Sequence, residues 1–124
     1  MTRPLEGATV LIVEDEFLIL LDLEHTLAGA GAEITTATSV EEATAVARQS
    51  FDAAVLDVRL PDGDVYPVAH MLLARDVPLV FHSGHAHNEN LQEAFPSAIA
   101  LEKPVRERVL IAALERQIAR TGAS

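Results

Sequence analysis

The sequence has no cysteine, few basic residues and no long uninterrupted apolar stretch. Without cysteine the chain can form no disulfide, no thiolate metal site and no cysteine nucleophile. No segment reaches the roughly 18 consecutive apolar residues that a membrane-spanning helix needs. The N-terminal residues Met1–Pro4 also lack the apolar core of a secretion signal. We therefore expect a cytoplasmic protein that has no membrane partner.

Acidic residues outnumber basic ones by 19 to 9, which gives a formal net charge of −10. The contacts that proteins make with the phosphate backbone of nucleic acids depend on a basic surface. The excess of acid therefore argues against nucleic acid as a partner. No internal repeat or low-complexity segment is present, and 124 residues fit one domain. We expect a single domain over residues 1–124, with its core at about 8–120.

Short apolar runs alternate with segments of helical periodicity along the chain. We expect strands at residues 8–14, 34–37, 53–56, 78–82 and 98–101, and helices at residues 16–28, 39–49, 65–74 and 105–120. Ser39 fits the N-cap of the second helix, with Glu42 reaching back to it as in a capping box. The apolar face of the last helix is predicted to consist of Val109, Leu110, Ala113, Leu114 and Ile118.

Residues 85–96 offer the only room for a helix between the fourth and fifth strands. His87-Asn88-Glu89-Asn90 is a poor helix former, so we expect one or two turns there, or an irregular loop. Leu60-Pro61-Asp62-Gly63 is expected to be a turn. Strands that alternate with helices predict an α/β fold, a doubly wound parallel sheet whose five strands most often lie in the order 2-1-3-4-5.

Chemically reactive side chains stand at the ends of the apolar runs. They are Glu14, Asp15, Asp57, Ser83 and Lys103, the last of which is followed by Pro104. Ligands of open parallel sheets bind at the carboxyl ends of the strands. Three carboxylates, one hydroxyl and one ammonium should therefore meet at one edge, although about ninety residues separate the first from the last. This set of charges suits a divalent cation together with a phosphoryl group.

These motifs, in this order, resemble the receiver domain of two-component response regulators. The similarity is carried by Val-Leu-Ile-Val-Glu-Asp-Glu at 10–16, by Val-Leu-Asp-Val-Arg-Leu-Pro-Asp-Gly at 55–63, and by Ser83-Gly84 and Lys103-Pro104. The resemblance implies a flavodoxin-like (βα)5 three-layer sandwich around a parallel five-stranded sheet, with a short or irregular fourth helix. It also implies that Asp57 accepts a phosphoryl group from a histidine kinase or a phosphotransfer protein and forms an aspartyl phosphate.

A metal ion belongs to the implied chemistry. A carboxylate cannot readily approach an anionic phosphoryl donor beside two further carboxylates unless a cation lies between them. Mg²⁺ suits this place because it is a hard cation that takes oxygen ligands and keeps several waters. The resemblance implies that Asp15 and Asp57 bind Mg²⁺ directly, together with the backbone carbonyl of Arg59. Glu14, where the family often has Asp, would act through water.

Two further side chains and one peptide bond take roles from the resemblance. Lys103 would pair with the acidic cluster at rest and with a phosphoryl oxygen afterwards, and Ser83 would donate a hydrogen bond to another phosphoryl oxygen. The Lys103-Pro104 peptide bond would be cis. The implied activity is self-catalysed phosphoryl acceptance and autodephosphorylation, so we expect no enzyme that turns over a separate substrate.

Position 100 departs from the common receiver pattern, because many receivers carry Tyr or Phe where this chain has Ala100. The usual switch couples movement of the Ser or Thr to rotation of that ring. Phe81-His82-Ser83-Gly84 is similar to the Phe-Ala-Thr-Gly subgroup of receivers, which also lacks the ring and has a reduced fourth helix. The resemblance therefore implies a switch at Ser83, Gly84 and Ala100 in which the loop from Gly84 to Phe95 becomes ordered.

Two features allow more than one interpretation. The run Phe17–Leu21 is apolar nearly all round, so it is either a partner surface or a helix covered by the core. His82, His85 and His87 do not have the spacing of a common structural zinc site. We expect them to be loop histidines near the mouth of the pocket.

Each motif taken alone also fits a plain structural role, such as surface charge, a helix cap or a turn residue. Together they favour a stand-alone response regulator receiver whose output passes through a phosphorelay or through contact with a downstream protein partner. The alternative is a receiver-like interaction domain that is never phosphorylated. A haloacid-type phosphatase is disfavoured because Asp57 lacks a second Asp two residues later. A nucleoside triphosphatase is disfavoured because no Gly-rich loop ends in Gly-Lys-Ser or Gly-Lys-Thr.

Overall fold

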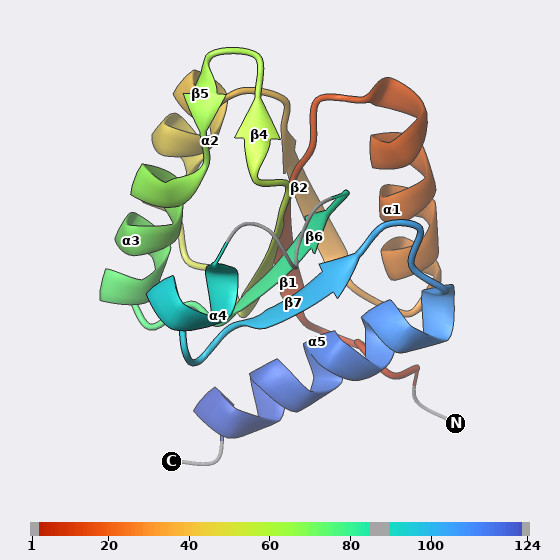
Figure 1. Ribbon diagram of the computed structural model, residues 1–124. Coiled ribbons are helices and arrows are strands. Elements are labelled where there is room, and N and C mark those ends of the chain that lie inside the picture. Colours follow the sequence, from red (N-terminus) through yellow and green to blue (C-terminus); the bar gives the residue numbers. More distant parts are fainter. Residues whose placement is uncertain (1–2, 85–89, 123–124) are drawn as a thin grey trace.

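A parallel sheet of five strands, in the order β2-β1-β3-β6-β7, forms the centre of residues 3–84 and 90–122, which the computed structural model describes. Figure 1 shows the sheet between two layers of helices. The strands are β1 (Thr9–Val13), β2 (Glu33–Ala37), β3 (Ala53–Leu56), β6 (Leu79–Ser83) and β7 (Ile99–Glu102). Each neighbouring pair is parallel. The predicted three-layer α/β fold and its strand order are confirmed.

In the described part of the chain, helices cover both faces of the sheet (Figure 1). One face carries α1 (Phe17–Gly29) and α5 (Glu107–Gly122), and the other carries α2 (Val40–Val46), α3 (Tyr66–Ala74) and α4 (Leu91–Ala94). Successive strand residues point to opposite faces. In β1, Val10 and Ile12 therefore pack toward α1 and α5, while Leu11 and Val13 pack toward α2 and α3.

Helix boundaries differ from the predictions by a few residues. α4 is a single turn, which confirms the predicted short fourth helix. α2 ends at Val46 rather than at residue 49. α5 begins at Glu107 rather than at residue 105, because Arg106 O accepts the first helical hydrogen bond, from Leu110 N. Within the described ranges, no helix is long and apolar enough to cross a membrane.

Side chains before and within the first turn of α2 organise its start. Ser39 Oγ accepts a hydrogen bond from Glu42 N at 3.1 Å, as predicted for an N-cap. The Glu42 carboxylate does not return to Ser39, however, because it accepts from the backbone N and the hydroxyl of Thr38, both at 2.7 Å. The predicted capping box is therefore half correct, and its second hydrogen bond is displaced by one residue.

The predicted turn at 60–63 is the tip of a small antiparallel hairpin. Its strands are β4 (Arg59–Leu60) and β5 (Gly63–Asp64). Asp62 at the tip accepts hydrogen bonds from Val40 N at 2.8 Å and from Glu41 N at 3.0 Å. Free N–H groups in a first helical turn favour a negative acceptor. The hairpin that follows Asp57 is therefore fastened to α2.

α1 leaves part of its apolar surface exposed. Its buried side is formed by Leu20, Leu23 and Leu27. Phe17 and Leu18 are 71% and 77% exposed, because a helix packed on one sheet can bury only one face. Of the two interpretations of this apolar run, a helix fully covered by the core is therefore wrong.

The buried stripe of α5 contains a polar residue. Leu110 and Leu114 are buried as predicted, but Val109 is exposed and Gln117 takes the next buried position, three residues after Leu114. Gln117 Nε2 donates hydrogen bonds to Leu79 O at 2.7 Å and to Ser97 O at 2.9 Å. This side chain therefore joins α5 to the beginning of β6 and to the segment before β7.

Gln117→Met should lower the free energy of unfolding by about 2–3 kcal/mol, because Met has a similar length but donates no hydrogen bond to the two carbonyl groups. Urea unfolding followed by circular dichroism measures the change. Arg116→Met, on the exposed side of α5, is the matched control and should change the free energy by less than about 0.5 kcal/mol. Equal losses in the two variants would contradict the role given to Gln117.

Candidate functional site

One row of side chains crosses the carboxyl end of the sheet. At this edge Val13 pairs with Leu56, and Leu56 pairs with Phe81, and all three residues face α2 and α3. The next residue on each strand points to the opposite face, toward α1 and α5. This row consists of Glu14, Asp57 and His82. Two acids therefore lie at the ends of neighbouring strands, and a histidine lies beside them on β6.

Glu14, Asp15 and Asp57 form an acidic cluster, in which one carboxylate oxygen from each lies within 4.8 Å of the others. Glu14 and Asp57 are buried, whereas Asp15 is exposed. Hard divalent cations take carboxylate oxygens as ligands, and Mg²⁺ usually combines one or two of them with water. The chemistry and spacing of this cluster therefore fit Mg²⁺.

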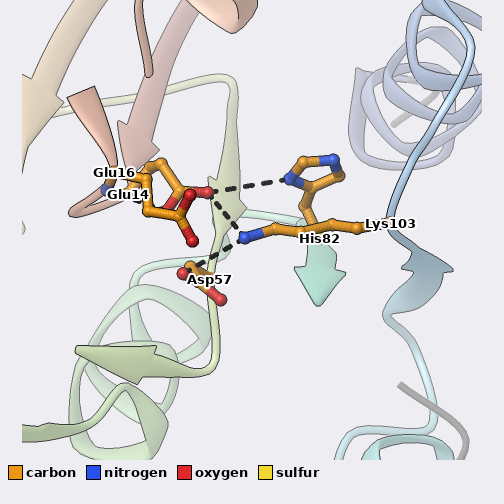
Figure 2. Close-up of polar contacts among 5 residues, drawn as sticks. All are labelled: Glu14, Glu16, Asp57, His82 and Lys103. Carbon is orange, nitrogen blue, oxygen red and sulfur yellow. Dashed lines mark hydrogen bonds and ion pairs between the residues drawn. The ribbon is translucent and has the colours of Figure 1, made fainter. Parts of the chain in front are cut away.

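Lys103 is the only lysine in the sequence, and its ammonium group lies against two of these carboxylates (Figure 2). Its Nζ is 2.9 Å from Glu14 Oε1 and 3.4 Å from Asp57 Oδ2. The backbone helps to place it, because Lys103 N donates a hydrogen bond to Ser83 O at 2.8 Å. The peptide bond between Lys103 and Pro104 is cis. One cation thus serves the acids at the ends of two neighbouring strands.

The second oxygen of Glu14 is held by the loop after β1. Glu14 Oε2 accepts a hydrogen bond from Glu16 N at 3.2 Å. Lys103 and Glu16 therefore each hold one oxygen of the same carboxylate, which fixes the orientation of Glu14. This contact of Glu16 could not be predicted, because it is made by the backbone and leaves no signal in the residue type.

The charges of the site shift its proton affinities. Burial raises the pKa of Asp57 to about 7, with the hydrogen bond and charge of Glu14 acting in the same direction and Lys103 opposing them. Burial acts to lower the pKa of Lys103, but the hydrogen bond to Glu14 and the charge of Asp57 outweigh it, so this pKa lies above its ordinary value. Lys103 is therefore charged, and a cation bound beside Asp57 would favour the charged carboxylate.

His82 lies on β6, and its side chain is 6% exposed. Its Nδ1 is 3.9 Å from Glu14 Oε1 and has no hydrogen-bond partner among the described residues. Burial, helped by the charge of Lys103, lowers the pKa of His82. His82 lies within β6, in agreement with the strand predicted at 78–82, and the description of His82 as a loop histidine is wrong. His85 and His87 lie outside the described residues.

A surface pocket of about 300 Å³ opens in front of the acidic cluster. It brings together most of the predicted site, since its lining consists of Asp15, Glu16, Asp57, Arg59, Ser83, Gly84 and Lys103. Glu14 and Ala100 are not part of the lining. The pocket is large enough for a phosphoryl group and a hydrated ion. Its lining offers them the carboxylates of Asp15 and Asp57 and the ammonium group of Lys103.

Ala100 pairs with Phe81 across β6 and β7. The aromatic rings beside it come from other segments. Phe95, which directly follows α4, is buried, and its ring centroid is 5.1 Å from that of Phe81 and 5.3 Å from that of Tyr66. Aromatic pairs at this spacing add to the stability that burial provides. The packing near Ala100 is thus completed by the segment between α4 and β7.

A doubly wound parallel sheet with buried acids and a lysine at its carboxyl edge defines a phosphoryl-accepting signalling domain. The family model described as the response regulator receiver domain matches residues 10–115. The chain therefore belongs to the response regulator receiver domain family. It is a receiver of two-component signalling, a class whose members accept a phosphoryl group from a phosphorelay.

Solved receiver structures resemble the chain over nearly its whole length. A response regulator receiver protein from Sinorhizobium medicae is 33% identical with a TM-score of 0.86, and the match covers 94% of this chain and 98% of that one. A non-phosphorylated HemR receiver domain from Leptospira biflexa is 29% identical with a TM-score of 0.81. This match covers 91% of this chain and 95% of that one. The receiver domain of a sensor histidine kinase from Pseudomonas aeruginosa, with a magnesium ion coordinated in its active site cleft, is 27% identical with a TM-score of 0.78. This match covers 91% of this chain and 98% of that one. A comparison with curated protein sequences found no match.

Without divalent cations, ionisation of Asp57 should make the folded domain less stable as the pH rises. The pKa of Asp57 is about 7 in the folded state and about 4 in the unfolded state, so the folded state binds the proton more tightly. This contribution to stability is complete below about pH 4 and is lost toward pH 7, by at most about 1.4 kcal/mol per pH unit.

Asp57→Asn cannot ionise and should remove this loss. Urea unfolding in the presence of a chelator, at about pH 5 and about pH 8, compares the two proteins, and the variant should gain on the wild type as the pH rises. The two proteins otherwise carry the same titrating groups, so the difference reports the ionisation of Asp57 together with its interaction with Glu14 and Lys103. A difference that is the same at both pH values would contradict a raised pKa.

Proposed function

We propose that Asp57 accepts a phosphoryl group from a phosphohistidine of a histidine kinase or of a phosphotransfer protein. The observation that carries this proposal is the shared ammonium group, since Lys103 Nζ lies 2.9 Å from Glu14 and 3.4 Å from Asp57. A carboxylate oxygen of Asp57 attacks the phosphorus, and the bond from phosphorus to the donor imidazole nitrogen breaks. The electron pair returns to the imidazole, and the product is an aspartyl phosphate.

Asp15 and Asp57, with the backbone carbonyl of Arg59, hold a Mg²⁺ ion directly. When bound, the ion neutralises negative charge between the Asp57 carboxylate and the phosphoryl oxygens. One oxygen of Glu14 forms an ion pair with Lys103 and the other accepts from Glu16 N, and Glu14 contributes through water. The Pseudomonas aeruginosa receiver with magnesium in its active site cleft supports this assignment.

Lys103 exchanges partners during the reaction. At rest its ammonium pairs with Glu14 and Asp57, and once Asp57 carries the phosphoryl group the ammonium pairs with a phosphoryl oxygen. Ser83 lines the same pocket and donates its hydroxyl hydrogen to another phosphoryl oxygen. The chain thus promotes only its own phosphorylation and dephosphorylation, and it is not an enzyme for a separate substrate.

The signal leaves the site through Ser83 and Gly84. Ala100 has no ring to rotate, and Phe95 fills the core near it. Movement of Ser83 and Gly84 toward the phosphoryl group orders the loop from Gly84 to Phe95, of which residues 85–89 lie outside the described residues. The surface formed by this loop, β6 and α5 is the place where a downstream protein partner would bind.

The whole chain, residues 1–124, forms one receiver domain with a core at about 8–120. The family match over residues 10–115 and the single large sheet of the described residues support this assignment. The phosphoryl groups of histidine kinases come from ATP, so the domain acts in the cytoplasm. A net charge of −10 disfavours nucleic acid as a partner.

Incubation of the protein with acetyl phosphate and Mg²⁺ should add a single phosphoryl group to Asp57, in a form that is labile to base. Intact-mass spectrometry measures the addition. Asp57→Asn should show none, because an amide is not a nucleophile here. Asp76→Asn is the matched control: Asp76 lies just after α3, and Asn also tolerates its φ of 61°.

Labelling of Ser83 or of a histidine in place of Asp57 would contradict the assignment. If neither acetyl phosphate nor a phosphorylated kinase labelled the wild type, the chain would instead be the receiver-like interaction domain that is never phosphorylated.

Asp15→Asn should weaken Mg²⁺ binding at least about tenfold and slow phosphorylation, because it removes a direct carboxylate ligand. Titration of the ¹⁵N-labelled protein with MgCl₂, followed by NMR, measures the affinity. Glu16→Gln removes one charge from the same pocket, but its carboxylate is outside the acidic cluster. Equal weakening by both variants would show that the pocket only attracts cations by its charge.

A further inference from the structure

Glu14 is a fully buried acid, and its nearest cation, Lys103, is expected to turn away from it when Asp57 is phosphorylated. Its exposed fraction is 0%, and its Oε1 lies 2.9 Å from Lys103 Nζ. If Lys103 turns toward a phosphoryl group on Asp57, Glu14 Oε1 loses this partner. A buried carboxylate oxygen without a donor or a counter-charge is strongly unfavourable. Movement of Lys103 away from Glu14 therefore requires a second hydrogen-bond donor at Glu14 Oε1.

His82 is placed to be that donor. Its side chain is 6% exposed, and its Nδ1 lies 3.9 Å from Glu14 Oε1. Among the described residues this nitrogen has no hydrogen-bond partner. Buried polar atoms normally have one, so the distance of 3.9 Å marks a contact that the resting arrangement leaves unmade. Figure 2 shows His82 and Lys103 approaching Glu14 Oε1 together.

At rest Glu14 Oε1 has an ion pair with Lys103 but, among the described residues, no hydrogen bond. The ammonium of Lys103 is within ion-pair distance of Oε1, whereas Nδ1 of His82 is about 1 Å too far for a hydrogen bond. His82 and Lys103 also line a common pocket of about 270 Å³ on the side of α1. A movement of Nδ1 by about 1 Å toward Glu14 would complete the contact.

We propose that His82 is a positioning residue that replaces Lys103 as the partner of Glu14 in the phosphorylated domain. In that state His82 donates its Nδ1 hydrogen to Glu14 Oε1, and Lys103 is free to bind the phosphoryl oxygen. The ring remains neutral throughout, and no proton is transferred. The proposal rests on the proposed function, since phosphorylation of Asp57 is what moves Lys103.

This exchange gives the histidine a role in the stability of the phosphorylated state. Without a replacement donor, movement of Lys103 toward the phosphoryl group would leave Glu14 unpaired in the interior. The presence of His82 removes this cost and so favours the phosphorylated arrangement. A residue that only filled space at this position would have no such effect.

Lys103→Met tests the exchange without any phosphoryl group, because it removes the ammonium and retains most of the side chain. NMR of ¹⁵N-labelled histidine reports the Nδ1 hydrogen of His82, and His82→Asn identifies its signals. In the Lys103→Met variant the Nδ1 signal should change to that of a hydrogen-bonded group. A crystal structure should show the distance from Nδ1 to Oε1 reduced from 3.9 Å to about 2.7–3.2 Å. An unchanged signal and an unchanged distance would overturn the proposal.

The pair His82→Asn and His82→Leu separates hydrogen bonding from packing. Asn and Leu have similar shapes, and the Asn amide can place an N–H near the position of Nδ1. With Mg²⁺ and beryllofluoride as the phosphoryl analogue, His82→Leu should bind the analogue roughly tenfold more weakly than wild type, and His82→Asn should recover most of the loss. Equal affinities in the two variants would overturn the proposal.

The two tests also distinguish this inference from the proposed function. If the wild type failed to bind beryllofluoride, the assignment of Asp57 as acceptor would be contradicted, and the Lys103→Met result would still decide whether His82 replaces Lys103 at Glu14. If beryllofluoride bound and drew Lys103 to itself while the Nδ1 signal of His82 stayed as at rest, the role of Asp57 would stand and that of His82 would be refuted.

Discussion

The site depends on one electrostatic constraint, which is that two carboxylates are buried side by side and a single ammonium group serves both. Glu14 and Asp57 end neighbouring strands, and like charges at such a distance repel strongly where water is scarce. Lys103 relieves this repulsion from the far side of β6. Because a lysine side chain is a flexible stem with a point charge, the same group can follow negative charge when it appears on a phosphoryl group. In the proposed function one cation thus serves both the buried acids at rest and the phosphoryl group afterwards.

The sheet places these groups through its register and not through their nearness in sequence. Val13, Leu56 and Phe81 are paired across β1, β3 and β6, so the residues that follow them lie at one level of the sheet. Since side chains alternate between faces, a slip of one residue would turn Asp57 into the core between the sheet and α2. The apolar runs before the acids therefore have two functions. They bury the strands, and by fixing the register they fix the distances on which the chemistry depends.

Much of this arrangement could be predicted from the sequence, because apolar runs, turn residues and the reactive residue after each run are local signals. They gave the sheet order, the short fourth helix and the pocket around Asp57. The failures have a common physical origin. The burial of His82 beside Glu14 was not predicted, Gln117 was not identified as buried and Val109 was expected inside. The hydrogen bonds of Asp62 to α2 were also not foreseen. Each depends on the distance to a partner in another element, which the periodicity of one segment does not contain.

The hairpin of β4 and β5 gives the pocket a fixed wall. Arg59, which lines the pocket, belongs to the first strand of this hairpin, and Asp62 at its tip is fastened to the start of α2. The segment after Asp57 is therefore held at both ends, by β3 before it and by the hydrogen bonds of Asp62 to α2. The two hydrogen bonds of Asp62 therefore link the segment after Asp57 directly to α2. The first turn of α2 therefore supports the pocket through its backbone N–H groups, although none of its side chains lines the pocket.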